Sequence, residues 1–504
     1  MTETAADTPA PPTVDLLVVG GGINGAGIAR DAAGRGFSVM LVEQDDLARH
    51  TSSASTKLIH GGLRYLEYYE FKLVRKALAE RERLIGAAPH IMWPMRFVMP
   101  HDAHLRPTWM IRAGLFLYDN LAKRRRLQGS RGIDLRRHPA GTALKAGFRR
   151  GFEYSDGWVD DARLVVLNAV DARERGATIL TRTRCESVRR EAGHWLATLT
   201  GPDGSREVRA RGLVNAAGPW AADFVRQRSP LRDKHKVRLV KGSHIIVPKL
   251  FDHDYAYIFQ APDRRIVFAL PYEGDYTLVG TTDVEHQGAP GPVEISAAEV
   301  DYLCGMANRY FGKAIAAPDV VWSYAGLRPL LEDEADDPSS VTRDYVFDLD
   351  DDGAPALSIY GGKLTTYRVL SEEAVHRIGA KLGPPRPAWT AGVPLPGGDL
   401  PDGDFARFLA EVDARWPWLP ERLRHRLARA YGTRMARILG DATRLDQLGT
   451  EVLPGLYAAE IDFLIREEWV QTAKDLLWRR SKLGLHLGPE ASETLAQWMA
   501  NRTP

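Results

Sequence analysis

The chain has 504 residues, of which 44% are hydrophobic and 26% are charged, and its formal net charge is +2. This composition is typical of a globular protein with a sizeable core, and the near-neutral balance argues against nucleic-acid binding. Its two cysteines, Cys185 and Cys304, exclude a disulfide framework and a cysteine-rich metal site; they fit a reducing cytosol, and no metal is expected. The first residues lack a basic and an apolar region, and no uncharged apolar run reaches about 18 residues, so neither a signal peptide nor a transmembrane helix is expected.

The chain begins with a predicted disordered tail over 1–12, followed by a strand, a helix and a second strand. VDLLVVGGG reads as a buried strand, INGAGIARDAAGRG as a helix and FSVMLVEQ as the next strand. This order predicts an α/β domain with a parallel sheet. Gly20, Gly22 and Gly25 fit the pattern G-x-G-x-x-G at the junction of strand and helix, where backbone N–H groups and the helix dipole favour a pyrophosphate.

Glu43 at the end of the second strand narrows the choice of dinucleotide. A carboxylate there accepts hydrogen bonds from both ribose hydroxyls and repels a 2′-phosphate, which favours FAD or NAD over NADP. FAD is favoured over NAD because TSSASTKLIHGGLRYL follows Glu43 directly, and because LVNAAGPWA (213–221) and YGGKLTTYR (360–368) place glycine-containing loops after predicted strands. A flavin lying lengthwise across the fold needs such returning loops.

Two of these loops are expected to lie close to the flavin ring. Gly61 and Gly62 predict that the backbone passes near the ring, because glycine permits a close approach. The GGKLTT loop is expected to open a helix whose first N–H groups, at about Leu364 and Thr365, stabilise the anionic reduced flavin. Asp160 and Asp161 are expected to cap a further helix.

The rest of the chain predicts a second, β-rich part and a helical C-terminus. Strand-like runs with turn residues between them fill 240–285, a solvated loop or edge with ten acids and one base spans 332–352, and LPGGDLPDGD (395–404) reads as a linker. We therefore predict an α/β fold in which two domains interleave over 13–394. These are a Rossmann-like FAD-binding domain (about 13–90, 160–240 and 355–385) and a substrate and membrane domain (about 91–159 and 241–354). A C-terminal all-helical cap domain follows over 405–504.

Several long motifs carry a family resemblance. GGGINGAGIARDAAGRG, TSSASTKLIHGGLRYLE, RGFEYSDGWVDDARL, VKGSHIIVP, VGTTDVE, AGLRPL and GGKLTTYR resemble the FAD-dependent sn-glycerol-3-phosphate dehydrogenases, in particular the quinone-linked aerobic bacterial type, within the glycine oxidase and D-amino-acid oxidase class. The resemblance implies oxidation of glycerol 3-phosphate to dihydroxyacetone phosphate, hydride transfer to FAD, electron transfer to membrane ubiquinone, and a homodimer. The expected cofactor contacts are Gly20, Gly22, Ile23, Asn24, Gly25, Glu43, Thr51, Ser52, Ser55, Lys57, Ile59, His60, Ala216, Gly218, Trp220, Gly362, Lys363, Leu364 and Thr365.

The substrate pocket implied by the resemblance contains Arg64, Tyr65, Arg328 and Lys363. An arginine fork suits phosphate oxygens, and lysine serves as a point charge. Hydride loss from an alcohol also needs a base or an alkoxide-stabilising group. His244 and His60 are the two candidate bases, and Arg328 is expected to stabilise the developing oxyanion; the sequence does not decide between the histidines.

Two basic, amphipathic segments are candidate membrane faces. Residues 105–131 carry seven Lys or Arg and one acid, interspersed with Trp, Ile, Leu, Phe and Tyr. That pattern predicts attraction to an anionic lipid surface, here the inner face of the cytoplasmic membrane, where ubiquinone would be reached. DLLWRRSKLGLHLG (475–488) is a weaker second case.

Three other interpretations stay open. They are an oxidase on the same scaffold that passes electrons to oxygen, an amine-oxidising flavoenzyme of the wider class, and a flavin-binding protein without turnover. The cation cluster argues against the amine-oxidising enzyme, because substrates of that enzyme need only a grip on a carboxylate.

Overall fold

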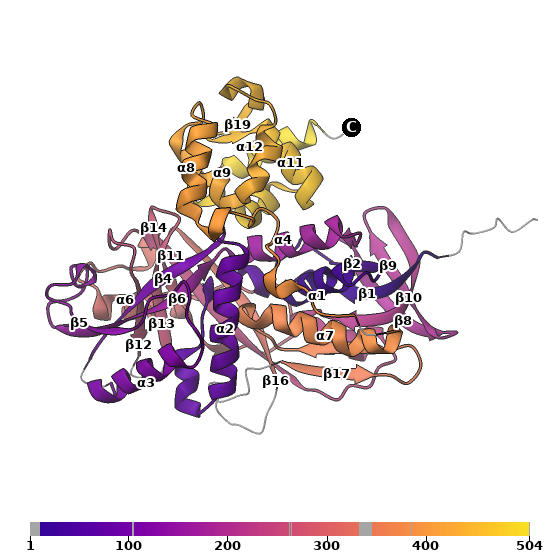
Figure 1. The fold of residues 1–504 in the computed structure, drawn as a ribbon, viewed down its shortest axis with the longest axis horizontal. Coiled ribbons are helices and arrows are strands. Elements are labelled where there is room, and N and C mark those ends of the chain that lie inside the picture. Colours follow the sequence, from indigo (N-terminus) through magenta and orange to yellow (C-terminus); the bar gives the residue numbers. More distant parts are fainter. Residues whose placement is uncertain are drawn as a thin grey trace, which may run out of the picture.

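The computed structural model describes residues 11–102, 105–261, 263, 265–331, 345–384 and 386–502. Within them the chain forms two large β-sheets with covering helices, and a helical C-terminal region packs against one side (Figure 1). Most of the predicted tail, and residues 332–344 of the predicted acidic loop, lie outside the described residues. In the described part of the chain, no helix combines the length and apolar character needed to cross a bilayer.

The first sheet is the predicted α/β core. Its central strands pair in parallel, in the order β18 (Ala356–Tyr360), β10 (Gly204–Asn215), β1 (Thr13–Val19), β2 (Val39–Val42) and β7 (Thr178–Leu180). Antiparallel strands complete it: β17 (Val346–Asp350), β8 (Arg184–Glu191) and β9 (His194–Gly201). The core strands are continuous apolar runs because both faces are covered. Helices α1 (Ile23–Gly34), α4 (Asp161–Glu174) and α7 (Tyr367–Leu382) pack on one face, and Trp195, Ala197 and Leu199 of β9 pack on the other.

The second sheet is the predicted β-rich part and is mostly antiparallel. Its order is β15 (Val284–Glu285), β11 (Val237–Pro248), β14 (Tyr276–Gly280), β13 (Ile266–Tyr272), β12 (Ala256–Gln260), β4 (Met92–Pro100), β6 (Arg150–Val159) and β3 (Leu58–Ile59). β16 (Trp322–Leu331) pairs with β11, and β5 (Arg131–Asp134) with β6. Helix α6 (Ala297–Tyr310) shares one core cluster with this sheet, and α2 (Phe71–Ala87) and α3 (Thr108–Asn120) share another.

The C-terminal region has its own hydrophobic core. It consists of α8 (Phe405–Arg415), α9 (Glu421–Tyr431), α10 (Met435–Leu439), α11 (Ala458–Glu468), a helical turn over Asp475–Arg480 and α12 (Ala491–Ala500). A hairpin of β19 (Glu451–Leu453) and β20 (Leu456–Tyr457) was not predicted; it turns at Gly455, which has φ +73°. The predicted fold class is confirmed with that addition, and the predicted domain boundaries stay predictions.

The segment 475–488 is not a membrane face, and that prediction was wrong. Arg479 and Arg480 are buried against the carboxylate of Asp46, at the junction between the C-terminal region and the first sheet. The ring of Trp478 stacks on Trp322 with centroids 3.7 Å apart. The amphipathic pattern therefore serves packing inside the molecule, because the buried charges find acidic partners from elsewhere in the chain.

Candidate cofactor and substrate site

A cavity of ≈ 350 Å³ opens where the parallel strands β1 and β2 end and α1 begins. The carboxyl ends of parallel strands are the usual ligand-binding edge of an α/β sheet. Eleven of the predicted cofactor residues line it: Gly20, Gly22, Ile23, Asn24, Glu43, Thr51, Ser52, Ala216, Gly218, Trp220 and Gly362. The cavity thus gathers the glycine turn after β1 and the two later glycine-containing loops, 213–221 and 360–368.

The glycines of the first loop are required by close backbone approach. Gly20 has φ +114°, and a Cβ there would lie 2.5 Å from the carbonyl oxygen of Ala216. A Cβ on Gly25 would lie 1.8 Å from the carbonyl oxygen of Gly20. Neither position tolerates a side chain, so the start of α1 sits directly on the turn that follows β1.

The start of α1 has the features of a phosphate and ribityl site. Gly22 precedes α1 and has no side chain to cap the helix. The N–H of Ile23 donates to Ser52 Oγ at 3.0 Å. Asn24 donates from Nδ2 to the Gly361 carbonyl, while its buried Oδ1 has no hydrogen-bond partner among the described residues. A helix N-terminus favours an anion, and the unpaired Oδ1 can accept a hydrogen bond from a ligand hydroxyl, so these residues fit FAD.

Glu43 is held in place by two backbone amides. Its Oε2 accepts a hydrogen bond from Gly21 N at 2.6 Å, and its Oε1 accepts one from Asp45 N at 2.8 Å. Burial raises the pKa of this carboxyl, and the two amides oppose that rise by stabilising the charged form. The carboxylate is therefore fixed at the cavity wall, where the sequence predicts a ribose.

Four predicted cofactor residues before His60 and inside α1 lie away from this cavity. Gly25 serves packing, and Ile59 is fully buried. Lys57 Nζ forms a buried ion pair with Asp161 Oδ1 at 2.8 Å, and Ser55 Oγ donates to Asp161 Oδ2 at 2.7 Å. Asp160 caps α4 as predicted, whereas Asp161 anchors the segment before β3; sequence reasoning missed this role.

The segment 51–60 joins three other elements at one place. Thr51 Oγ1 donates to the carbonyl of Leu327 on β16 at 2.6 Å. Thr56 Oγ1 lies 2.9 Å from His244 Nε2 on β11, and His60 N donates to Thr365 Oγ1 at 3.2 Å. The segment 51–60 therefore contacts residues of three other motifs that lie far away in the sequence.

Two of the predicted substrate residues are in contact. The ammonium of Lys363 lies 4.0 Å from the centroid of the Tyr65 ring. Arg64, in the 3₁₀ turn Leu63–Tyr68, is half-buried, and its Nη2 donates to Tyr68 OH at 3.4 Å. The loop carrying Lys363, Leu364 and Thr365 follows β18 and precedes α7, as predicted.

Gly61 has a different role from the one expected. A Cβ there would lie 2.3 Å from Leu78 Cδ2 and 2.6 Å from Tyr118 OH, and its N–H donates to Tyr118 OH at 2.9 Å. The close approach is to helices α2 and α3 of the chain itself. Gly62 is needed for its backbone conformation, with φ +73°. Packing within the chain already excludes a side chain at Gly61, and the expected passage of this backbone near the flavin ring stays a prediction.

Arg328 and His244 lie in neighbouring strands. Arg328 Nη1 pairs with Asp283 Oδ1 at 2.7 Å, and Nη2 donates to the Thr282 carbonyl at 2.7 Å. His244 is buried and stacks on Tyr324. Burial, followed by the positive charges of Lys57 and Arg328, holds the pKa of His244 well below its usual range, so the imidazole is neutral and weakly basic. Asp283 was missed as an Arg328 partner although it lies in the quoted motif VGTTDVE.

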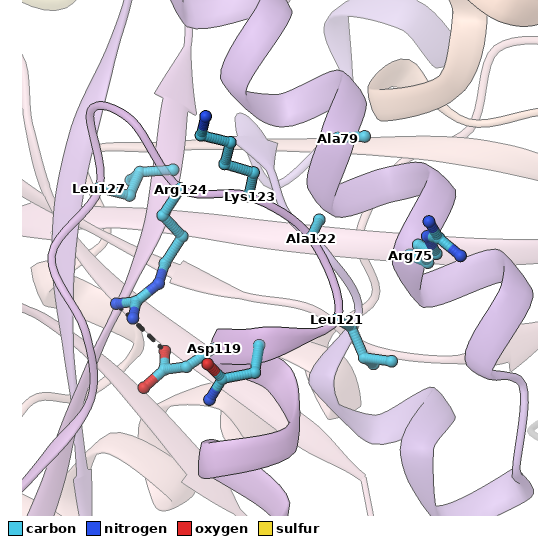
Figure 2. A pocket seen from close by; sticks show the side chains of 9 residues that line it. Arg75, Ala79, Asp119, Leu121, Ala122, Lys123, Arg124 and Leu127 are labelled. Carbon is cyan, nitrogen blue, oxygen red and sulfur yellow. Dashed lines mark ion pairs between the residues drawn. The ribbon is translucent and has the colours of Figure 1, made fainter.

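The predicted basic face over 105–131 remains largely exposed. On α3, Trp109 and Phe116 are 68% and 63% exposed. Beside α3 lies a pocket of ≈ 820 Å³ whose lining includes Arg75, Lys123 and Arg124 (Figure 2). Arg124 makes only a distant contact with Asp119, at 3.8 Å. Neither Arg75 nor Lys123 has an ion-pair partner among the described residues.

Comparison with known proteins gives concordant matches over the whole chain. Residues 15–368 match the family described as FAD dependent oxidoreductase, and residues 388–503 match the C-terminal domain of alpha-glycerophosphate oxidase. A glycerol-3-phosphate dehydrogenase of Pseudomonas aeruginosa is 54% identical (99% of this chain, 98% of the relative). A D-erythritol 1-phosphate dehydrogenase of Brucella abortus is 50% identical (97% and 98%). The solved FAD complex of the Bacillus halodurans glycerol-3-phosphate dehydrogenase has a TM-score of 0.77 at 28% identity, covering 97% of this chain and 90% of that chain.

Proposed function

Because the chain belongs to the family of FAD-dependent oxidoreductases, we propose that it oxidises sn-glycerol 3-phosphate to dihydroxyacetone phosphate. The assignment of this substrate rests on the 54% identity, over nearly the full length of both chains, to a protein named glycerol-3-phosphate dehydrogenase. D-Erythritol 1-phosphate is the second candidate, because a relative named for it is 50% identical. Both substrates combine a phosphate ester with a secondary alcohol, so one set of residues suits either.

The cations of the site would bind the phosphate and the reacting oxygen. Arg64 precedes Tyr65 in the chain and the Lys363 ammonium lies over the Tyr65 ring, and we assign the phosphate to these two cations. Arg328 is held by Asp283 and by the Thr282 carbonyl, so its guanidinium is oriented before substrate arrives; we assign it the alcohol oxygen, whose negative charge grows as the proton leaves. FAD, when bound, accepts the hydride from the carbinol carbon.

The alcohol proton needs an acceptor, and we propose His60 in preference to His244. His244 is shielded and lies beside two cations, so protonating it is costly. Its contact with Thr56 instead suits a role in holding the segment 51–60. His60→Gln is expected to lower kcat by about 10²–10⁴-fold, and His244→Gln by less. A His60→Gln enzyme with wild-type kcat would exclude His60 as the base.

Electrons are proposed to leave to ubiquinone at an anionic membrane surface, with α3 and the adjoining basic pocket as the peripheral contact. Trp109 and Phe116 are exposed on α3, and the C-terminal end of α3 borders the basic pocket, which matches an interfacial helix. A homodimer stays part of this proposal. An oxidase is the competing assignment, and turnover with a ubiquinone analogue under anaerobic conditions, against peroxide release in air, separates the two.

Substrate preference is tested by kcat/KM for sn-glycerol 3-phosphate, D-erythritol 1-phosphate and glycerol. We expect glycerol 3-phosphate to give the highest value and glycerol a value lower by at least 10²-fold, because glycerol lacks the phosphate and thus loses more than one charged hydrogen bond. A higher value for D-erythritol 1-phosphate would replace the first candidate by the second. Equal values for glycerol and glycerol 3-phosphate would contradict both.

A further inference from the structure

The wall of the cofactor cavity next to Glu43 is held by the C-terminal region. Residues Ala48, Arg49 and His50 line the cavity, and Asp46 lies just before them. Asp46 is 1% exposed, and its carboxylate has side-chain partners only from the C-terminal region among the described residues. Arg480 donates to both of its oxygens, at 2.8 and 2.9 Å, and Arg479 Nε donates to Oδ2 at 2.5 Å.

Short backbone contacts connect Asp46 to the cofactor-binding groups. Asp45 N donates to Glu43 Oε1, and Ala48 N donates to the Gly21 carbonyl at 3.1 Å. Gly21 N in turn donates to Glu43 Oε2. The residues on either side of Asp46 thus fix both the carboxylate of Glu43 and the turn that precedes α1.

A second contact reaches the same wall from the other side. Arg182 N donates to the Asp45 carbonyl at 2.8 Å, and Thr183 N donates to the Glu43 carbonyl at 2.7 Å. The Arg182 side chain reaches Asp475 Oδ2 at 2.7 Å, and Asp475 also accepts from Arg479. Both strand-end segments beside Glu43 are therefore tied to one buried ionic cluster in the C-terminal region.

The pKa of Asp46 depends on its pairing with Arg479 and Arg480. Burial alone would raise its pKa, but the two guanidinium groups bring the pKa below its usual value. A carboxylate that stays buried without these cations is strongly disfavoured, so loss of the pairing should displace the segment that follows Asp46 at the cavity wall.

We propose that Asp46 and Arg480 are positioning residues for the cofactor, through which the C-terminal region controls how tightly FAD is retained. The inference rests on FAD as the cofactor and does not depend on which substrate is oxidised. It assigns to the C-terminal region a role at the cavity that it does not itself line.

The test compares Asp46→Asn with Glu174→Gln. Glu174, at the end of α4, pairs with Arg434 across the same junction, but it does not line the cavity. The measured quantities are the FAD dissociation rate of each holoenzyme, followed by the recovery of free-flavin fluorescence after dilution, and the melting temperature of each apoprotein. We expect Asp46→Asn to release FAD about tenfold faster than wild type, and Glu174→Gln to stay within about twofold.

A third variant, Arg480→Lys, keeps the charge and loses the bidentate contact with Asp46. Its rate of FAD release should therefore lie between those of wild type and Asp46→Asn. It also replaces Asp46→Asn as the test variant should the latter not fold. Wild-type FAD release from the folded variants would overturn the proposal. So would equal acceleration in Glu174→Gln, because general loosening of the junction would then explain the effect.

Discussion

Two basic segments with a similar mix of residue types lie in opposite environments. Residues 105–131 and 475–488 each mix Arg and Lys with Trp and Leu, and both satisfy the pattern of an interfacial segment. The first leaves Trp109 and Lys123 exposed, whereas the second buries Arg479 and Arg480 against Asp46. The difference lies in the partners, because Arg479 and Arg480 of the second segment meet Asp46 from a distant part of the chain, in addition to Asp475 of their own segment. An amphipathic basic pattern therefore indicates an interface without saying whether its partner is lipid or protein.

The largest expected effect comes from breaking a buried ion pair at the junction with the C-terminal region. Glu468, fully buried, pairs with Arg163 of α4 across the junction. Glu468→Ala leaves a buried guanidinium unpaired and is expected to lower the free energy of unfolding by about 3–5 kcal/mol. The control is Asp462→Ala, which removes the half-exposed pair with Arg502 and should cost about 1 kcal/mol or less. Urea unfolding of both variants checks this; similar losses would show that burial is not what distinguishes the pairs.

Arg328 and Lys363 differ from the cations of both segments because they are proposed to bind the substrate. Lys363→Ala removes a charged hydrogen bond proposed to hold the phosphate, a loss of about 1.5–3 kcal/mol, so KM should rise about 10- to 150-fold. Arg328→Ala removes the group assigned to the alcohol oxygen, so it should lower kcat as well. FAD affinity should change less. Arg309→Ala, which removes a surface pair with Asp102, is the control and should leave KM unchanged. Normal substrate kinetics in both site variants would show that the assignments of Lys363 to the phosphate and of Arg328 to the alcohol oxygen are wrong.

The junction should also weaken with acid, through His90. This buried histidine has no hydrogen-bond partner among the described residues, and burial together with Arg163 and Arg429 lowers its pKa to about 3. Since the folded pKa lies below the unfolded value of about 6.5, the stabilisation is complete above pH 6.5 and is lost as pH falls toward 3. By pH 5 the loss is about 2 kcal/mol. Between pH 7 and pH 5 the loss of unfolding free energy should be about 2 kcal/mol smaller in His90→Phe than in wild type, because the other buried histidines, such as His244, titrate in both. Equal pH dependence would contradict this.

The smallest expected effect concerns the exposed basic face over 105–131. Lys123→Gln should weaken binding to anionic phospholipid vesicles by about 1 kcal/mol, or about fivefold, and the difference should disappear at high salt. Arg206→Gln is the control, because β10 and α3 lie at opposite ends of the molecule (Figure 1). Equal loss of binding in both variants would mean that net charge, and not this face, governs the interaction.

The features predictable from the sequence were local ones. The glycine pattern, Glu43 and the alternation of strand and helix depend on neighbours within about 30 residues, and the structure places them together at one cavity. The features that escaped prediction depend on distant partners. Asp161 binds Lys57, Gly61 packs on Tyr118, and Arg480 finds Asp46 only after the chain has folded.

The central claim is that this chain is a flavoenzyme that oxidises a polyol phosphate, and anaerobic titration of the holoenzyme tests it most directly. Addition of sn-glycerol 3-phosphate should bleach the flavin absorbance band, while the same concentration of glycerol should leave it unchanged. Bound FAD that glycerol 3-phosphate and D-erythritol 1-phosphate both fail to bleach would contradict the account.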